Sequence, residues 1–441
     1  MGLLLLCGLP LAQQEGLQAA FWAFPKKDSW PCSFCLPYAL CSSSAHCLFW
    51  FIGKVVEAIQ LQIDLQKEYG LVLEGGGAKG AYQIGAWRAL REAGVRIRAV
   101  AGTSVGALNG ALICMDDFEK AEQIWENIRY SSVMDVDDSL MEKLRRLQRK
   151  DFSSFSSLPL GELAGEIRRI VRERGFDIGP LRALIDQMVD EGRLRSSDRE
   201  LYVVTYSLSD RCPMTVDIKE APEGAIGDLL MASAYLLGFK KEPLGGKYYL
   251  DGGGVNNVPV DVLLNRGYED IIVLRIYGYG VDTEKYLEIP ENVNLYHIAP
   301  RQDLGGLLEF DSRKARRNMA LGYFDGMRML YGLAGRAYYL DAPQKETYYL
   351  ERLLAEARDI GREFPEGGNE DSIRFYVEEA FPYWARKWKL KEGWDYKELY
   401  LAALEQLARQ YGISRFHIYT PDSLWRLIRQ RRAFAEPYFQ S

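Results

Sequence analysis

The chain has 441 residues and a mass of 50.3 kDa, which is too long for one ordinary core and indicates two or three folded units. Hydrophobic residues make up 48% of it and charged residues 26%, so a disordered or collagen-like chain is excluded. The 55 basic and 61 acidic residues give a net charge of -6, and without a basic excess we expect no nucleic-acid partner.

The first 66 residues differ in character from the rest. An apolar stretch at the start is too short to span a bilayer, and five of the seven cysteines lie before residue 50. The spacing of Cys32, Cys35, His46 and Cys47 matches no standard zinc site, so we expect no metal. We interpret residues 1–66 as a poorly ordered N-terminal extension. The scarcity of cysteine elsewhere favours a cytoplasmic protein, whose membrane contact we expect to be peripheral.

An α/β pattern begins near residue 69, where short apolar runs end in glycine and lead into segments of helical period. We predict strands over residues 71–73, 97–101, 201–205, 214–218, 248–250, 271–274 and 293–298, and helices over residues 81–93 and 105–115. This alternation predicts a central, mostly parallel sheet with helices on both faces, within residues 67–300. The spacing of Leu and Ala beyond it predicts a mainly helical region over residues 301–441.

The first glycine turn, residues 75–80 with the sequence GGGAKG, lies between a predicted strand and a predicted helix. Backbone N–H groups at a helix N-terminus bind negative charge, so the turn is a candidate anion site. It also matches the dinucleotide pattern G-x-G-x-x-G, but the second strand lacks the acidic residue that would bind a ribose. Lys79 could stabilise the turn, attract an anionic head group or be a solvated residue.

Two further turns carry candidate catalytic side chains. Residues 102–106, GTSVG, match the nucleophile elbow G-x-S-x-G, whose glycines allow a tight turn that exposes the hydroxyl of Ser104. A serine at a helix start is also typical of an N-cap. Asp251 precedes Gly252 at the end of another predicted strand, where an aspartate beside glycines often does no more than form a tight turn.

A serine hydrolase normally uses a histidine as its base, yet none of the three histidines adjoins a glycine turn. This combination resembles the patatin-like phospholipases, in particular the bacterial type, which use a Ser-Asp dyad. Their motif G-G-G-x-K/R-G is similar to residues 75–80, their elbow to residues 102–106 and their D-G-G motif to residues 251–253. Residues 232–239 resemble a further block of the family, although Leu237 replaces its usual proline.

The resemblance covers about residues 68–330 and implies a lipid acyl hydrolase of the phospholipase A or lysophospholipase type that needs no cofactor. Ser104 would attack the ester carbonyl and form an acyl-serine, with Asp251 as the base. Backbone N–H groups of the first turn would form the oxyanion hole. The implied site residues are Ser104 and Asp251, the elbow glycines Gly102 and Gly106, and the turn residues Gly75, Gly76, Gly77, Ala78, Lys79 and Gly80.

Two other functions are compatible with the sequence. The order Ser104, Asp251, His297 is that of an esterase triad, although a structural strand histidine is the simpler interpretation of His297. A lipid-binding protein without catalysis could retain the fold, but it has no need of the complete set of serine, aspartate and glycines. Residues 422–434 place apolar side chains on one side of a helix, which is typical of a membrane-surface helix or of one that packs on its own core.

Overall fold

The computed structural model of the chain describes residues 61–139, 141–142, 172, 175–236, 238–363 and 372–435. These residues form two compact units, the first containing Ile63–Met329 and the second containing residues 61–62 and the described residues from Leu330 onward. The N-terminal extension as far as residue 60, with its cysteines and His46, lies outside the described residues, as does Leu237. Within the described ranges, no helix combines the length and the hydropathy that crossing a membrane requires.

A seven-stranded sheet forms the centre of the first unit. Its strands are β1 (Glu68–Leu73), β2 (Arg96–Thr103), β3 (Glu200–Ser207), β4 (Cys212–Asp217), β5 (Tyr249–Asp251), β6 (Asp270–Leu274) and β7 (Asn294–Ile298). The main path has the order β4-β3-β2-β1-β6-β7, and β5 pairs with β3. Strands β4 and β5 run antiparallel to β3, whereas the other pairs are parallel. The predicted mostly parallel sheet is confirmed.

Helices cover both faces of the sheet, because its central strands are apolar on both sides. Within the described residues of this unit, the α-helices are α3 (Ala81–Glu92), α4 (Val105–Cys114), α5 (Phe118–Asn127), α8 (Gly179–Met188), α9 (Glu191–Ser196), α10 (Ile226–Ser233), α11 (Val260–Leu264) and α12 (Ser312–Tyr331). Helix α4 packs through Gly110 on the side chains of Val100 and Leu201. On the opposite face, α11 shares a core with Val72 and Ala101.

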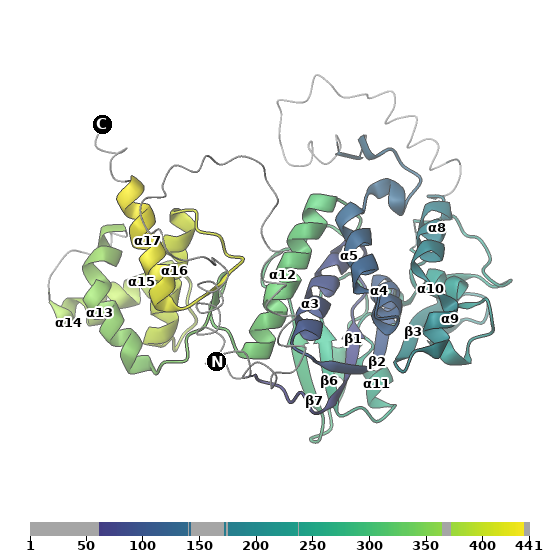
Figure 1. Ribbon diagram of the computed structural model, residues 1–441, viewed down its shortest axis with the longest axis horizontal. Helices are drawn as coiled ribbons and strands as arrows, with labels where there is room; N and C mark the ends of the chain where they lie inside the picture. Colours follow the sequence, from purple (N-terminus) through teal and green to yellow (C-terminus); the bar gives the residue numbers. More distant parts are fainter. Residues whose placement is uncertain are drawn as a thin grey trace, which may run out of the picture. The chain divides into compact units, whose positions relative to one another are not determined.

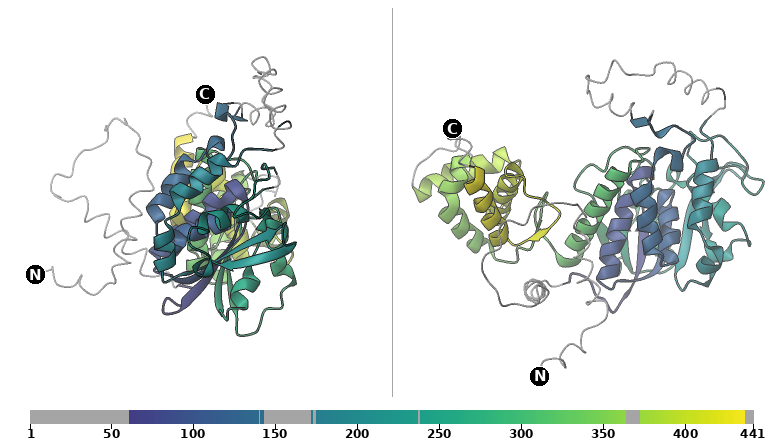
Figure 2. Two further views of the ribbon diagram at one scale, coloured as in Figure 1. Left: turned by 90° about the vertical axis from the view of Figure 1, so that its right-hand side faces the viewer. Right: turned by 45° about the horizontal axis from the view of Figure 1, so that its top comes forward.

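Helix α12 packs within the first unit, although it lies beyond residue 300. Gly322 lies so close to α3 that an added Cβ would stand 1.9 Å from the carbonyl oxygen of Tyr82. Glycine at this contact therefore lets the two helix backbones approach closely. Figure 1 shows α12 and α3 next to one another above the sheet, and the right-hand view in Figure 2 shows the helices of this unit running side by side.

The second unit confirms the predicted C-terminal helical region. It contains α13 (Glu346–Glu363), α14 (Ile373–Phe375), α15 (Phe381–Lys387), α16 (Tyr396–Gln410) and α17 (Pro421–Ala435), with the short parallel strands β8 (Tyr339–Leu340) and β9 (Ile418–Tyr419). From α17, Leu424, Trp425 and Ile428 are buried in the core of this unit, and Leu427 is exposed. The apolar side of the C-terminal helix therefore packs on its own unit, as the second interpretation of its pattern expected.

Candidate active site

The first two glycine turns leave the sheet side by side. Strands β1 and β2 are parallel neighbours, with Leu73 opposite Gly102. Because parallel strands end at the same edge of a sheet, the glycine turn (residues 75–80) and Ser104 emerge next to each other. A Cβ added to Gly75 would lie 3.3 Å from the Cβ of Ser104, so the turn touches the serine.

Strand β5 brings Asp251 to the same place. Strand β2 pairs with β3 as far as Thr103, which lies opposite Val204. From Thr205 onward β3 pairs instead with β5, and Thr205 lies opposite Asp251. Strand β4 occupies the other edge of β3, so β5 takes over the edge that β2 leaves. Asp251 therefore enters the sheet where Ser104 departs from it.

The backbone of Ser104 has a conformation that residues with a side chain rarely adopt, with φ 56° and ψ -125°. The elbow glycines make this turn sterically feasible. A Cβ added to Gly106 would stand 2.3 Å from the carbonyl oxygen of Leu73, and a Cβ added to Gly102 would stand 2.5 Å from the backbone of Gly106. The N–H of Ser104 donates to Ser233 Oγ at 2.8 Å. Ser104 occupies the N-cap position of α4, but its side chain makes no capping hydrogen bond.

Of the two carboxylate oxygens of Asp251, one accepts a hydrogen bond and the other does not. Its Oδ1 accepts the N–H of Gly253 at 2.7 Å. Its Oδ2 is buried and has no hydrogen-bond partner, although the residue as a whole is only half-buried. Burial raises the pKa of Asp251 from 3.8 to about 6, against the opposing effects of the nearby Ser104 side chain and the Gly253 N–H. This carboxylate can therefore accept a proton near neutral pH.

Some backbone N–H groups of the glycine turn donate hydrogen bonds within the fold, and others remain available to a ligand. The N–H of Gly75 donates to the carbonyl oxygen of Asn257 at 3.1 Å, and that of Ala78 donates to the carbonyl oxygen of Leu307 at 2.7 Å. Within the part of the chain that the structure describes, the turn N–H groups left without an acceptor are those of Gly76 and Gly77. An oxyanion hole at this turn would therefore use these two donors.

Lys79 and Gly80 have structural contacts. Lys79 is 9% exposed, and its Nζ donates to the carbonyl oxygen of Tyr277 at 2.5 Å and lies 5.7 Å from the ring centre of Tyr279. The carbonyl oxygen of Gly80 accepts from Asn109 Nδ2 at 3.0 Å. Of the three interpretations considered for Lys79, these contacts favour stabilisation of the turn.

An apolar cavity adjoins Ser104 and Gly77. Apart from these two residues and Asn109, its walls are hydrophobic side chains. They are Val105, Leu108, Ile124, Trp125, Ile128, Val133, Leu181, Leu184, Met188, Ala234, Leu236, Phe239 and Phe310. Its composition is typical of a site for an apolar ligand.

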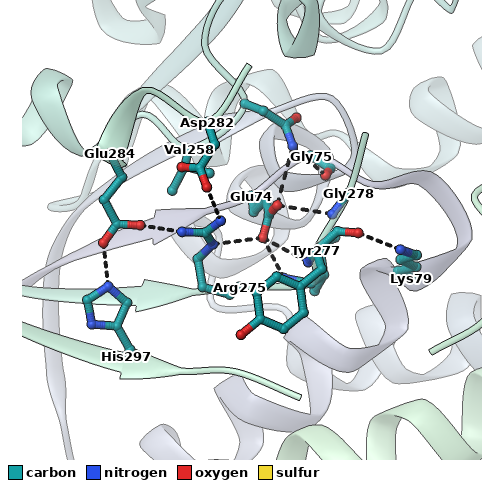
Figure 3. Close-up of polar contacts among 12 residues, drawn as sticks. Glu74, Gly75, Lys79, Val258, Arg275, Tyr277, Gly278, Asp282, Glu284 and His297 are labelled. Carbon is teal, nitrogen blue, oxygen red and sulfur yellow. Dashed lines mark hydrogen bonds and ion pairs between the residues drawn. The ribbon is translucent and has the colours of Figure 1, made fainter. Parts of the chain in front are cut away.

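His297 lies on β7, at the far edge of the sheet, with β1 and β6 between that strand and β2. Its ring is hydrogen-bonded to Glu284 and not to Ser104 or Asp251 (Figure 3). The other described histidine, His417, belongs to the second unit and packs beside the ring of Tyr419. Within the described part of the first unit, therefore, no histidine approaches the Ser104 hydroxyl.

Sequence reasoning missed two residues that hold this site. Ser233 lies in the block that resembled the family, but nothing in its pattern indicated that its hydroxyl accepts the Ser104 N–H. Glu74 precedes the glycine turn and forms an ion pair with Arg275, which is 201 positions away along the chain. The place of Glu74 directly before a glycine motif was the available signal, but its partner could not be identified without the fold.

Comparison with known proteins shows which family part of this chain resembles. Residues 71–264 match the family model of the patatin-like phospholipases. A patatin-like phospholipase domain-containing protein of Caenorhabditis elegans is 28% identical over 243 residues, which are 53% of this chain and 16% of the relative. A neuropathy target esterase of Drosophila melanogaster is 31% identical over 223 residues, which are 49% of this chain and 13% of the relative. The chain therefore spans a small part of these relatives.

Among solved structures, VipD from Legionella pneumophila is similar to this chain with a TM-score of 0.37 and 14% sequence identity. The match covers 78% of this chain and 84% of VipD.

Proposed function

Because residues 71–264 form a patatin-like phospholipase domain, we propose that the protein hydrolyses carboxylic esters of lipids through a Ser104–Asp251 dyad. The observation that carries this proposal is the Asp251 carboxylate. Its Oδ2 is buried and unpaired next to the elbow serine, and burial raises its pKa to about 6. A base with such a pKa can take a serine proton at neutral pH and return it later.

The proposed reaction has two steps. In the first, Ser104 Oγ attacks the ester carbonyl carbon while its proton passes to Asp251 Oδ2, and the N–H groups of Gly76 and Gly77 bind the oxyanion. The intermediate collapses to an acyl-serine, and the departing alcohol takes the proton from Asp251. In the second, a water molecule attacks the acyl carbonyl, Asp251 accepts its proton, and the fatty acid leaves as Ser104 regains its hydrogen.

The apolar cavity supports a lipid as the substrate. It adjoins both the nucleophile and the turn, so an acyl chain in the cavity would place its carbonyl carbon beside Ser104 Oγ. Hydrophobic walls favour a hydrocarbon chain over a polar acyl group. We propose a phospholipase A or lysophospholipase type of activity. Peripheral contact with a lipid surface and a cytoplasmic location belong to the same proposal.

The experiment is product analysis by mass spectrometry after incubation with mixed-chain phospholipids, lysophospholipids and glycerides. We expect the parent chain to release free fatty acids and a fluorophosphonate probe to label Ser104. Ser104→Ala should lose both while keeping the circular dichroism spectrum, because it removes only a hydroxyl. Fatty-acid release that persists in Ser104→Ala would refute the assignment. A folded parent that binds lipid vesicles without hydrolysis would instead indicate a lipid-binding protein.

A further inference from the structure

Glu74 is a buried carboxylate that the proposed mechanism does not use. It is the residue between β1 and Gly75, and it is 2% exposed. Its side-chain oxygens accept three successive backbone N–H groups, from Ile276 at 2.7 Å, Tyr277 at 3.0 Å and Gly278 at 3.0 Å. Its Oε2 also lies 3.1 Å from Arg275 Nε (Figure 3). Burial of a charge is costly unless it is paired, and here each oxygen is paired.

The segment that Glu74 holds, residues 275–279, supports the glycine turn directly. A Cβ added to Gly278 would stand 1.8 Å from the carbonyl oxygen of Gly75, so the two backbones are in contact. At the other end of the turn, Lys79 Nζ donates to the carbonyl oxygen of Tyr277 at 2.5 Å. The turn is therefore attached to this supporting segment by the residue before its first glycine and by the lysine near its end.

The negative charge of Glu74 is neutralised by the neighbouring guanidinium of Arg275. An isolated carboxylate beside an oxyanion hole would repel the negative charge that develops there. Arg275 faces Glu74 and two further carboxylates, Asp282 and Glu284. Asp282 has a further cation in Lys285 at 3.3 Å, and Glu284 is hydrogen-bonded to His297. Burial lowers the pKa of Arg275, but Glu74 and Asp282 raise it by more, so the guanidinium stays charged.

We propose that Glu74 is a positioning residue for the oxyanion hole, because it anchors residues 275–279 beneath the turn and so holds the N–H groups of Gly76 and Gly77 in place. The inference rests on the proposed function. An oxyanion hole acts through donors that are already oriented, so loosening them weakens transition-state binding more than substrate binding. The effect of losing Glu74 should therefore appear in kcat and not in KM.

The second unit offers a matched control. Glu405 is 4% exposed, and its Oε1 accepts three successive backbone N–H groups, from Arg336 at 2.7 Å, Ala337 at 3.0 Å and Tyr338 at 3.0 Å. Glu74→Gln and Glu405→Gln each remove the negative charge of a buried carboxylate that accepts three backbone N–H groups. At Glu74 both oxygens accept, so the amide nitrogen takes the place of one acceptor, whereas at Glu405 the amide oxygen can accept all three N–H groups. Glu405→Gln therefore controls for the neutralisation of a buried carboxylate that anchors a segment of the other unit.

The experiment compares the full-length parent, Glu74→Gln, Glu74→Asp and Glu405→Gln on a soluble ester. Rates are normalised to the sites that a fluorophosphonate labels at completion. We expect Glu74→Gln to lower kcat by about 10- to 100-fold with KM within about twofold, and to weaken binding of a trifluoromethyl ketone by a similar factor, because that inhibitor forms an oxyanion. Glu74→Asp, which keeps the charge on a shorter side chain, should recover part of the loss. Glu405→Gln should change kcat less than twofold.

Three outcomes would overturn the inference: a kcat of Glu74→Gln within twofold of the parent, a loss confined to KM, or a failure of both Glu74 variants to fold. The last would mean that the carboxylate maintains the fold and not the turn. Failure of the proposed function is distinguishable, since the parent chain would then lack hydrolysis that depends on Ser104, before any Glu74 variant is compared.

Discussion

Replacement of Asp251 by asparagine should abolish hydrolysis and, at neutral pH, stabilise the first unit. The pKa of Asp251 is about 6 in the fold against 3.8 for an unperturbed aspartate, and burial is the main cause. Each pH unit between these two values corresponds to about 1.4 kcal/mol, so keeping this carboxylate ionised costs the folded protein about 3 kcal/mol. Asparagine has nearly the same shape and carries no charge. It leaves an amide without a partner where Oδ2 was, which offsets about 1–2 kcal/mol of the gain.

The pH dependence gives the sharper test. Because the pKa is higher in the fold, the folded state binds more protons than the unfolded state between pH 3.8 and about 6. Asp251 therefore does not lower the free energy of unfolding at a pH below its pKa in the unfolded state. The destabilisation is complete once the pH has risen through its pKa in the folded state. The stability of Asp251→Asn relative to the parent should rise by about 1.4 kcal/mol between pH 5 and pH 8, and stay constant above pH 8.

The assay is urea denaturation of parent and variant at pH 5 and pH 8. Unfolding is monitored by hydrogen exchange of the β2 and β3 amides. These strands report on the first unit alone, whereas tryptophan fluorescence would mix both units. Taking the difference between the two proteins at each pH cancels the titration of other groups. An equal stability difference at pH 5 and pH 8 would show that Asp251 has no raised pKa, and would remove the reason for regarding it as the base.

Three further results are expected. The rate of ester hydrolysis should fall as the pH decreases, with half of its maximum near pH 6, since Asp251 must be ionised to accept a proton; a midpoint near pH 4 would argue against this base. Gly252→Ala should lower the free energy of unfolding by about 1–3 kcal/mol, because the new Cβ would stand 2.3 Å from the carbonyl oxygen of Val204, whereas Gly254→Ala has open space and should change it by less than about 0.5 kcal/mol. His297→Ala should keep most of the activity, and a loss of more than about a hundredfold in kcat would favour the Ser-His-Asp alternative.

The local features of this protein could be predicted from its sequence. Each predicted strand overlaps an observed one, and the turns at residues 75–80, 102–106 and 251–253 follow strands as expected. These signals are short in range, since an apolar run, a glycine pair and a helical period each reflect the preferences of neighbouring residues. The motifs also carried the family resemblance, which the match over residues 71–264 confirmed.

The tertiary structure decided which of those residues meet and which atoms remain free. Asp251 lies beside Ser104 because β5 takes over the edge of β3 that β2 leaves, and this register depends on pairing between distant strands. Only the fold assigns Gly75 and Ala78 N–H groups to the carbonyl oxygens of Asn257 and Leu307.

The same limit applies to buried charges and to helix faces. Glu74 and Arg275 are 201 positions apart, and no local pattern links them. The sequence pattern of α17 is the same whether its apolar side contacts lipid or protein. The structure shows that this side contacts protein, because Leu424 and Ile428 are buried in the core of the second unit. A sequence pattern records how apolar a side chain is, whereas its partner is set by the path of the chain through space.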